Sequence, residues 1–123
     1  MRDPGERSEH ACKKVGDDMT RVFELFGKRW TGLIVAVLMG GGAYFAEIRR
    51  AIPGISERML SDRLAELAGV GLVAREVDEG PPLRVGYRLT AAGKAMEPAL
   101  KELSRWAETY LPDGGGCPER FRR

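Results

Sequence analysis

A sharp turn between two helices is predicted by the stretch Ile52-Pro53-Gly54-Ile55-Ser56. Before the turn one helical face carries Phe45, Ile48 and Ile52, and after it another carries Leu60, Leu64 and Leu67. The first helix ends here because a residue that precedes proline avoids helical geometry. The second is expected to run from its N-cap, Ser56, to Ala68. Two short amphipathic helices joined in this way are typical of a helix-turn-helix.

The pattern changes its period after these two helices. Apolar residues alternate with polar or small ones over residues 73–77 and again over 85–89, which predicts the two strands of a hairpin. The residues between them, 78–84, contain two prolines and are too many for a two-residue turn, so we expect a projecting loop. A last helix is expected to start at the N-cap Thr90, with Pro98 bending its first turns.

Two more helices are expected before the turn. The first has one apolar stripe, made of Met19, Val22, Phe23 and Phe26. The second begins near Trp30, is mostly core and stops at the three glycines 40–42. The order of elements predicts a mainly α fold with a small β-hairpin (α+β), a winged helix-turn-helix domain over residues 17–111 with additional N- and C-terminal helices. Residues 1–16 and 112–123 are expected to be flexible tails.

Composition limits the possible classes of function. The 123 residues are 43% apolar and 31% charged, and the net charge is only +2. This fits one globular domain and excludes the strongly basic surface of an indiscriminate nucleic-acid binder. The longest apolar run, residues 33–39, is far shorter than the roughly 20 residues that cross a bilayer. Residues 1–9 lack the apolar stretch of a signal peptide, so we expect a cytoplasmic protein without membrane contact.

Catalytic and metal chemistry find little support in the sequence. His10 is the single histidine, and the two cysteines, Cys12 and Cys117, lie near opposite ends of the chain. Neither a metal site nor a histidine-centred catalytic triad is expected, and no glycine motif follows a strand as a phosphate cradle would. We therefore expect no enzyme activity and no cofactor.

The second helix of a helix-turn-helix lies in the major groove of DNA, with its first residues at the base edges. Here the leucine stripe must face the core, so the polar side chains of this helix point outward. Arg58 suits guanine, while Arg84, at the end of the loop, suits a minor groove. The predicted DNA-binding residues are Arg49, Arg50, Ser56, Arg58, Ser61, Asp62, Arg63 and Arg84. The alternative is an ordinary solvated helix face with mixed charges.

An ordered set of motifs carries a family resemblance over residues 12–107. The set comprises Gly27-Lys28-Arg29-Trp30, Phe45-Ala46-Glu47-Ile48, the turn itself, Leu60-Ser61-Asp62-Arg63-Leu64-Ala65-Glu66-Leu67, Gly71-Leu72-Val73-Ala74-Arg75, Pro81-Pro82, Val85, Tyr87, Leu89-Thr90, Gly93 and Trp106. It resembles the HxlR-type family of bacterial transcriptional regulators. The resemblance implies a homodimeric winged-helix protein that binds a palindromic or near-palindromic double-stranded DNA operator, with the terminal helices as dimerisation helices.

Apolar residues on the terminal helices are the candidates for the dimer interface. These candidates are Met19, Val22, Phe23, Phe26, Met96, Leu100, Leu103 and Trp106. Packing within one protomer is the alternative, and it must hold in part. A pocket for a small aromatic effector, lined by Phe23, Phe26, Trp30 and Trp106, is conceivable, although aromatic residues at helical spacing are more often plain core.

The sequence departs from the family pattern at three places. Tyr44 stands where the family often has an arginine, and Gly86 where it often has an acidic residue, which puts a phosphate contact and a wing contact in doubt. Cys12 matches an N-terminal cysteine that senses electrophiles or oxidants in some members, but Lys13 replaces the proline that usually follows. A neighbouring lysine stabilises a thiolate. The alternative for Cys12 is a small apolar residue at the dimer interface.

The sequence thus predicts a sequence-specific DNA-binding transcriptional regulator that binds its operator as a homodimer. Repression is favoured over activation, because blocking a promoter needs no further surface. The regulator is expected to respond to an electrophile, an oxidant or a small aromatic ligand. The alternative is a winged-helix module that binds a protein or a ligand without binding DNA.

Overall fold

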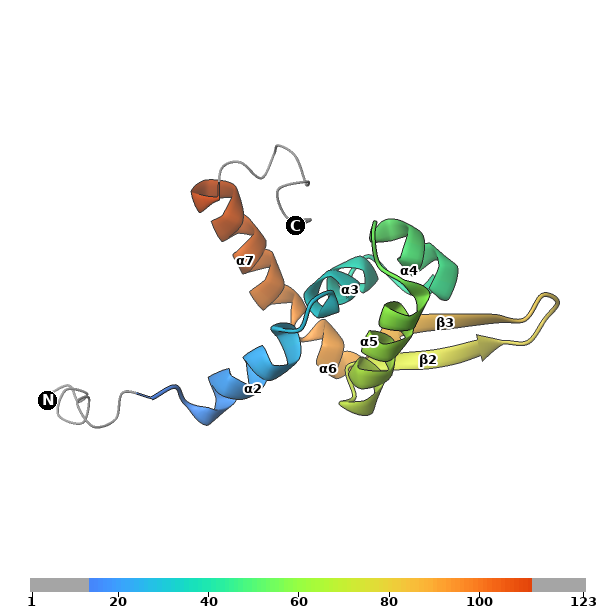
Figure 1. Ribbon diagram of the computed structural model, residues 1–123, viewed down its shortest axis with the longest axis horizontal. Helices are drawn as coiled ribbons and strands as arrows, with labels where there is room; N and C mark the ends of the chain where they lie inside the picture. The colour runs from blue at the N-terminus through green and yellow to red at the C-terminus, as the bar shows by residue number, and fades with distance from the viewer. Residues whose placement is uncertain (1–13, 112–123) are drawn as a thin grey trace, which may run out of the picture.

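The computed structural model describes residues 14–111, so the expected tails lie almost wholly outside the described residues. Its elements are α2 (Asp17–Phe26), α3 (Thr31–Leu38), β1 (Ala43–Tyr44), α4 (Phe45–Ala51), α5 (Glu57–Gly69), β2 (Val73–Asp78), β3 (Arg84–Leu89), α6 (Ala91–Lys94) and α7 (Glu97–Tyr110). Helices α3, α4 and α5 gather at the base of the hairpin β2–β3, which projects as a wing, while α2 and α7 extend away from this body (Figure 1). The predicted winged helix-turn-helix fold is confirmed.

The core lies between the three central helices and the base of the sheet. The predicted stripe of Leu60, Leu64 and Leu67 on α5 is completely buried, as is Ile48 on α4. The other fully or almost fully buried apolar residues are Ile34, Val35, Leu38, Ile52, Ile55, Val73 and Leu89. Because each helix buries only one face, the opposite face of α5 is left to solvent.

The turn between α4 and α5 has the local chemistry that its sequence predicts. Gly54 adopts a φ of 93°, in the left-handed region that side chains disfavour. Ser56 is the N-cap of α5, and its hydroxyl oxygen accepts a hydrogen bond from the backbone N–H of Met59 at 3.0 Å. The turn therefore fixes the starting point of α5 relative to α4.

The sheet has one strand more than the hairpin that we predicted. The strand order is β1-β3-β2, and both pairings are antiparallel. Strand β1 has only two residues, Ala43 and Tyr44, which pair with Tyr87 and Gly86 of β3. A strand of two residues shows no alternation, so periodicity could not predict it. Because α4 starts at the next residue, the helix-turn-helix is joined directly to the wing.

The prediction of one continuous helix from Thr90 is wrong. Thr90 caps only the short α6, through a hydrogen bond from the N–H of Gly93 to its hydroxyl oxygen at 3.2 Å. A new helix, α7, begins at Glu97 and holds Pro98 in its first turn. Proline is tolerated there, because the first N–H groups of a helix have no partner within it, whereas a continuous helix would bring its ring against a carbonyl.

Candidate nucleic-acid interface

The first half of α5 presents the polar surface that the sequence predicts. Ser56, Arg58, Ser61 and Asp62 are all exposed, on the side opposite the leucine stripe. The Ser56 oxygen uses one lone pair for the Met59 N–H, which leaves the hydroxyl proton available as a donor. This helix face therefore combines donors and acceptors of the kinds that recognise base edges and phosphates.

Arginines flank this face, and they differ in what their guanidinium groups contact. Arg49, on α4, forms an ion pair across the turn with Glu57 at the start of α5, with Nη1 and Oε2 2.8 Å apart. Arg50 and Arg58 are exposed and form no ion pair with any residue between 14 and 111. The charges of Arg50 and Arg58 are thus the ones most available to an anionic partner.

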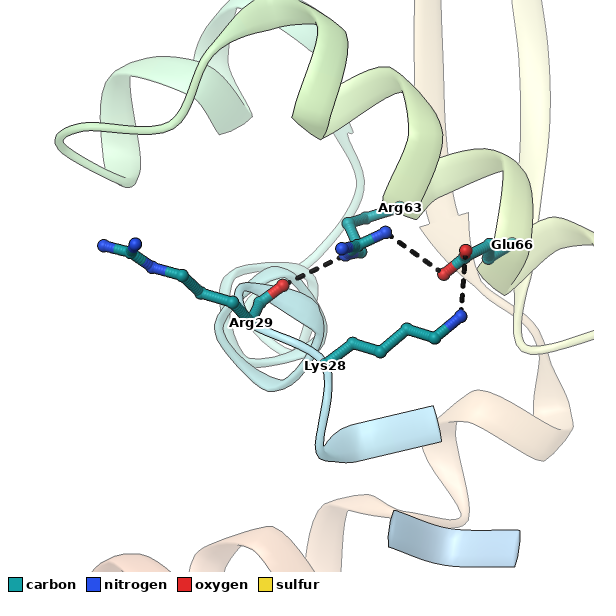
Figure 2. Close-up of polar contacts among 4 residues, drawn as sticks. All are labelled: Lys28, Arg29, Arg63 and Glu66. Atoms are coloured by element: carbon teal, nitrogen blue, oxygen red, sulfur yellow. Dashed lines mark hydrogen bonds and ion pairs between the residues drawn. The ribbon is translucent and has the colours of Figure 1, made fainter. Parts of the chain in front are cut away.

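Arg63, one of the predicted DNA-binding residues, has partners within the protein. Its Nε–H donates to the carbonyl oxygen of Arg29 at 3.0 Å, and its Nη1 lies 3.5 Å from Oε1 of Glu66 (Figure 2). The Arg63 side chain is only 17% exposed. Lys28 completes the cluster, with its Nζ 3.1 Å from Oε2 of Glu66. The four residues join α5 to the segment between α2 and α3.

Trp30 shapes that segment through an unusual backbone conformation. It is the one residue other than glycine with a positive φ, 82°, in the described part of the chain. Its ring packs against the core, and the Arg29 guanidinium lies 4.3 Å from the ring centroid. Such a conformation persists only where the surroundings hold it, which here are the core contact and the hydrogen bond to Arg63. The sequence motif at 27–30 gave no sign of this geometry.

The wing arginine, Arg84, lies beside a residue that the sequence had marked only as a departure. Its guanidinium carbon is 4.1 Å from the centroid of the Tyr44 ring. The Tyr44 hydroxyl donates to Oδ2 of Asp78, at 3.1 Å, on β2, the strand beyond β3 in the sheet. Tyr44 and Gly86, two of the three departures from the family pattern, are cross-strand partners. No sequence pattern predicts this cluster, because its members are 34 residues or more from Tyr44.

The residues predicted to form a dimer interface or a pocket fall into two environments. Phe26, Trp30 and Leu100 pack against the core, and Met96 is half-buried. The exposed members are Met19, Val22, Phe23, Leu103 and Trp106. Because Phe23 and Trp106 are exposed while Phe26 and Trp30 touch the core, the four pocket candidates do not share one environment within a protomer. The pocket and the interface remain predictions.

Three further expectations concern the cysteines, metal binding and membrane contact. Cys12, the candidate sensor, lies outside the described residues, as does Cys117. Within residues 14–111, no cluster of three or more histidine, cysteine, aspartate or glutamate side chains is arranged to hold a metal ion. No helix in this range is both long and apolar enough to span a membrane.

The helix pair, the polar face of α5 and the wing define the class of winged helix-turn-helix DNA-binding proteins. A family model described as HxlR-like helix-turn-helix matches residues 25–114. The chain belongs to this family, and it is a DNA-binding transcriptional regulator rather than an enzyme. The resemblance stated from the sequence motifs is thereby confirmed.

Known relatives agree with this assignment. The HTH-type transcriptional regulator YodB of Bacillus subtilis (strain 168) is 43% identical over 96 residues, which cover 78% of this chain and 86% of YodB. The crystal structure of quinone-bound YodB superposes with a TM-score of 0.68 at 41% identity, covering 77% of this chain and 100% of that one. The redox regulator HypR in its reduced form gives 0.71 at 33% identity, covering 76% and 92%. These relatives match the main prediction and not the module without DNA binding.

Proposed function

We propose that the chain is a cytoplasmic repressor that binds a palindromic or near-palindromic operator as a homodimer. The observation that carries this proposal is the exposed first half of α5, where Arg58 and the nearby Arg50 form no ion pair with any residue between 14 and 111. Arg58, Ser61 and Asp62 read base edges in the major groove, while Ser56, Arg49 and Arg50 hold phosphates. Arg84 enters the adjacent minor groove.

Arg63 has a separate place in the proposal. Its guanidinium donates within the protein, to Arg29, and lies beside Glu66. A phosphate contact from Arg63 would have to compete with these partners. We therefore assign Arg63 chiefly to holding α5 in place, at the flank of the bound DNA.

Self-association is supported by the terminal helices. Neither α2 nor α7 contains a buried residue, although α2 carries Met19, Val22 and Phe23, and α7 carries Leu103 and Trp106, as exposed apolar side chains. Isolated helices of this length are marginally stable in water. A second copy of the chain that covers these faces would stabilise them. Two-fold symmetry would then place the two α5 helices about 34 Å apart, in successive major grooves.

Regulation is the least direct part of the proposal. We propose that Cys12 reacts with an electrophile or oxidant, with Lys13 and Lys14 stabilising its thiolate. The support is similarity to YodB, whose structure has been solved with a quinone bound, and to the redox regulator HypR. A small aromatic ligand between the terminal helices is the other candidate effector. Treatment with diamide or iodoacetamide should weaken operator binding by the natural protein and leave a Cys12→Ser variant unaffected; equal responses would contradict this role.

Selection from a random pool of double-stranded DNA tests the central proposal. The natural protein should enrich a sequence with two-fold symmetry, and its affinity should fall steeply with salt. Arg58→Ala should relax specificity at one base pair, at a cost of about 1–3 kcal/mol. Arg50→Ala should weaken binding uniformly and reduce the salt slope by about one. Failure to enrich any sequence would contradict the proposal.

A further inference from the structure

An aromatic platform, the ring of Tyr44, lies beside Asp78 and Arg84, the last strand pair before the wing loop, and its position is fixed from three sides. We propose that Tyr44 is a positioning residue for Arg84, holding the wing guanidinium ready for the minor groove. The guanidinium carbon lies 4.1 Å from the centroid of the Tyr44 ring. This inference rests on the proposed binding of DNA through the wing, and it assigns a role to a residue that the family pattern does not explain.

The backbone of Tyr44 is held by both the helix-turn-helix and the sheet. Its N–H donates to Oε1 of Glu47, at 2.7 Å, where it begins α4. In the sheet it pairs with Gly86 of β3. The Cα of Tyr44 therefore cannot move relative to α4 or to β3 without breaking one of these contacts.

The side chain of Tyr44 is fixed by β2, the strand of the wing that does not pair with β1. Its hydroxyl donates to Oδ2 of Asp78 at 3.1 Å, and the other carboxylate oxygen of Asp78 accepts from the N–H of Gly80, at 3.3 Å, in the wing loop. The ring also lies against β3, because a Cβ at Gly86 would be 3.6 Å from Cδ1 of Tyr44, in ordinary van der Waals contact. The ring is thus tied to both strands of the wing.

Stacking on the ring orients Arg84 without consuming its hydrogen-bond donors. A guanidinium that stacks through its planar face keeps its N–H groups pointing outward in the plane. Arg88, four residues further along β3, is held differently, since its Nε donates to Oε2 of Glu76 at 2.8 Å. Arg84 is therefore held by the ring while its guanidinium makes no hydrogen bond or ion pair within residues 14–111, whereas the donors of Arg88 are partly used.

An Arg84 guanidinium that is already oriented by the Tyr44 ring is favoured for insertion into a narrow minor groove. An arginine that is already oriented loses less conformational freedom on binding than one on a mobile stem. The narrow groove of an A-tract attracts such a cation through its negative potential. The Tyr44 platform should thus strengthen binding only where Arg84 makes the contact.

A double-mutant cycle on DNA affinity tests this dependence. The probe is a fluorescein-labelled duplex that the natural protein has selected from a random pool, and the variants are Tyr44→Leu, Arg84→Ala and the double variant. Tyr44→Leu should raise Kd by about two- to fivefold, the range of an exposed cation–π contact. In the Arg84→Ala background the same change should have no further effect. Additive losses would overturn the proposal, because Tyr44 would then act without Arg84.

Two further variants keep the result interpretable. Tyr44→Phe retains the ring and removes its bond to Asp78, so it should weaken binding less than Tyr44→Leu and again only when Arg84 is present. Arg88→Ala, the matched control on β3, should show full additivity with Tyr44→Leu. Thermal unfolding of each variant shows whether it is folded, and if Tyr44→Leu is not, the Tyr44→Phe cycle decides. If the natural protein selects no DNA at all, the proposed function fails together with this inference, whereas additivity in a protein that binds its duplex overturns only the inference.

Discussion

The Nε–H of Arg63 donates to the carbonyl oxygen of Arg29 at 3.0 Å, across 34 residues of sequence. This bond ties the middle of α5 to the segment that leads out of α2, and the ion pair between Lys28 and Glu66 lies beside it (Figure 2). A displacement of α2 therefore acts directly on the helix that we assign to the major groove. Because Arg63 makes this contact within the protein while Arg58 on the same helix is exposed, substitutions of the two arginines should affect stability to different extents.

Replacing Arg63 should affect stability more than a surface arginine does. Arg63→Ala leaves the Arg29 carbonyl without its donor and Glu66 without one cation, so we expect a loss of about 1–3 kcal/mol in the free energy of unfolding. Urea denaturation at fixed protein concentration measures this loss. Arg58→Ala, on the exposed face of the same helix, should change it by less than about 0.5 kcal/mol. Equal effects of the two variants would show that the Arg29 contact contributes nothing.

Ser56 allows helix capping to be separated from DNA contact. Ser56→Ala removes the acceptor for the Met59 N–H and should cost about 1 kcal/mol of stability. Ser56→Asp restores an equally good cap and should unfold within about 0.5 kcal/mol of the natural protein. The same carboxylate would face a phosphate, so its affinity for the selected duplex should fall by more than about tenfold. An Asp variant that binds normally would remove Ser56 from the phosphate contacts.

The exposed apolar faces of α2 and α7 predict how the oligomeric state can be changed. Phe23→Glu and Trp106→Glu place a charge on faces where the natural side chains are 64% and 51% exposed in a single protomer. We expect each variant to shift the mass measured by light scattering from that of a dimer toward that of a monomer. Leu83→Glu, at an equally exposed residue of the wing, should leave the mass unchanged. A natural protein with monomer mass at micromolar concentration would contradict the dimer.

Two glycines should respond in opposite directions to the same substitution. Gly69 lies in the last turn of α5, and a Cβ there would have no atom within 4 Å, so Gly69→Ala should stabilise the protein by about 0.5–1 kcal/mol. At Gly93, a Cβ would overlap the carbonyl oxygen of Leu72, so Gly93→Ala should destabilise by more than about 1 kcal/mol. Urea midpoints measure both changes. Shifts in the same direction would contradict the packing described around α6.

The central helices and the hairpin could be predicted because their signals are local. The leucine stripe of α5 repeats at three and four residues, the cap at Ser56 is a single residue type, and the strands of the wing alternate over five residues. Strand β1 has no such signal. The break before Pro98 depends on whether one continuous helix or two shorter helices give the folded protein the lower free energy. Local pattern alone does not decide that balance.

The candidate site likewise contains residues whose positions follow from local sequence and residues whose environments depend on tertiary contacts. Exposure of Ser56, Arg58 and Ser61 follows from the period of one helix, so the sequence places them correctly on the outer face. The environments of Arg63 and Arg84 depend on partners at Arg29 and Tyr44, in segments brought close only by tertiary structure. Formal charge therefore overstated the number of arginines available to DNA, because it does not record which guanidinium groups already have partners.

The two residues of β1 have a consequence for the spacing of the operator. Since Tyr44 belongs to the sheet and Phe45 begins α4, no linker separates the wing from the helix-turn-helix. The two therefore form one rigid unit with two DNA-contacting arms, the wing and α5. Inserting one base pair between the segments that the two arms contact would rotate one segment by about 34° relative to the other. Neither arm can follow that rotation alone, so a half-site lengthened by one base pair should lose the contribution of an entire arm even when every contacted base is unchanged.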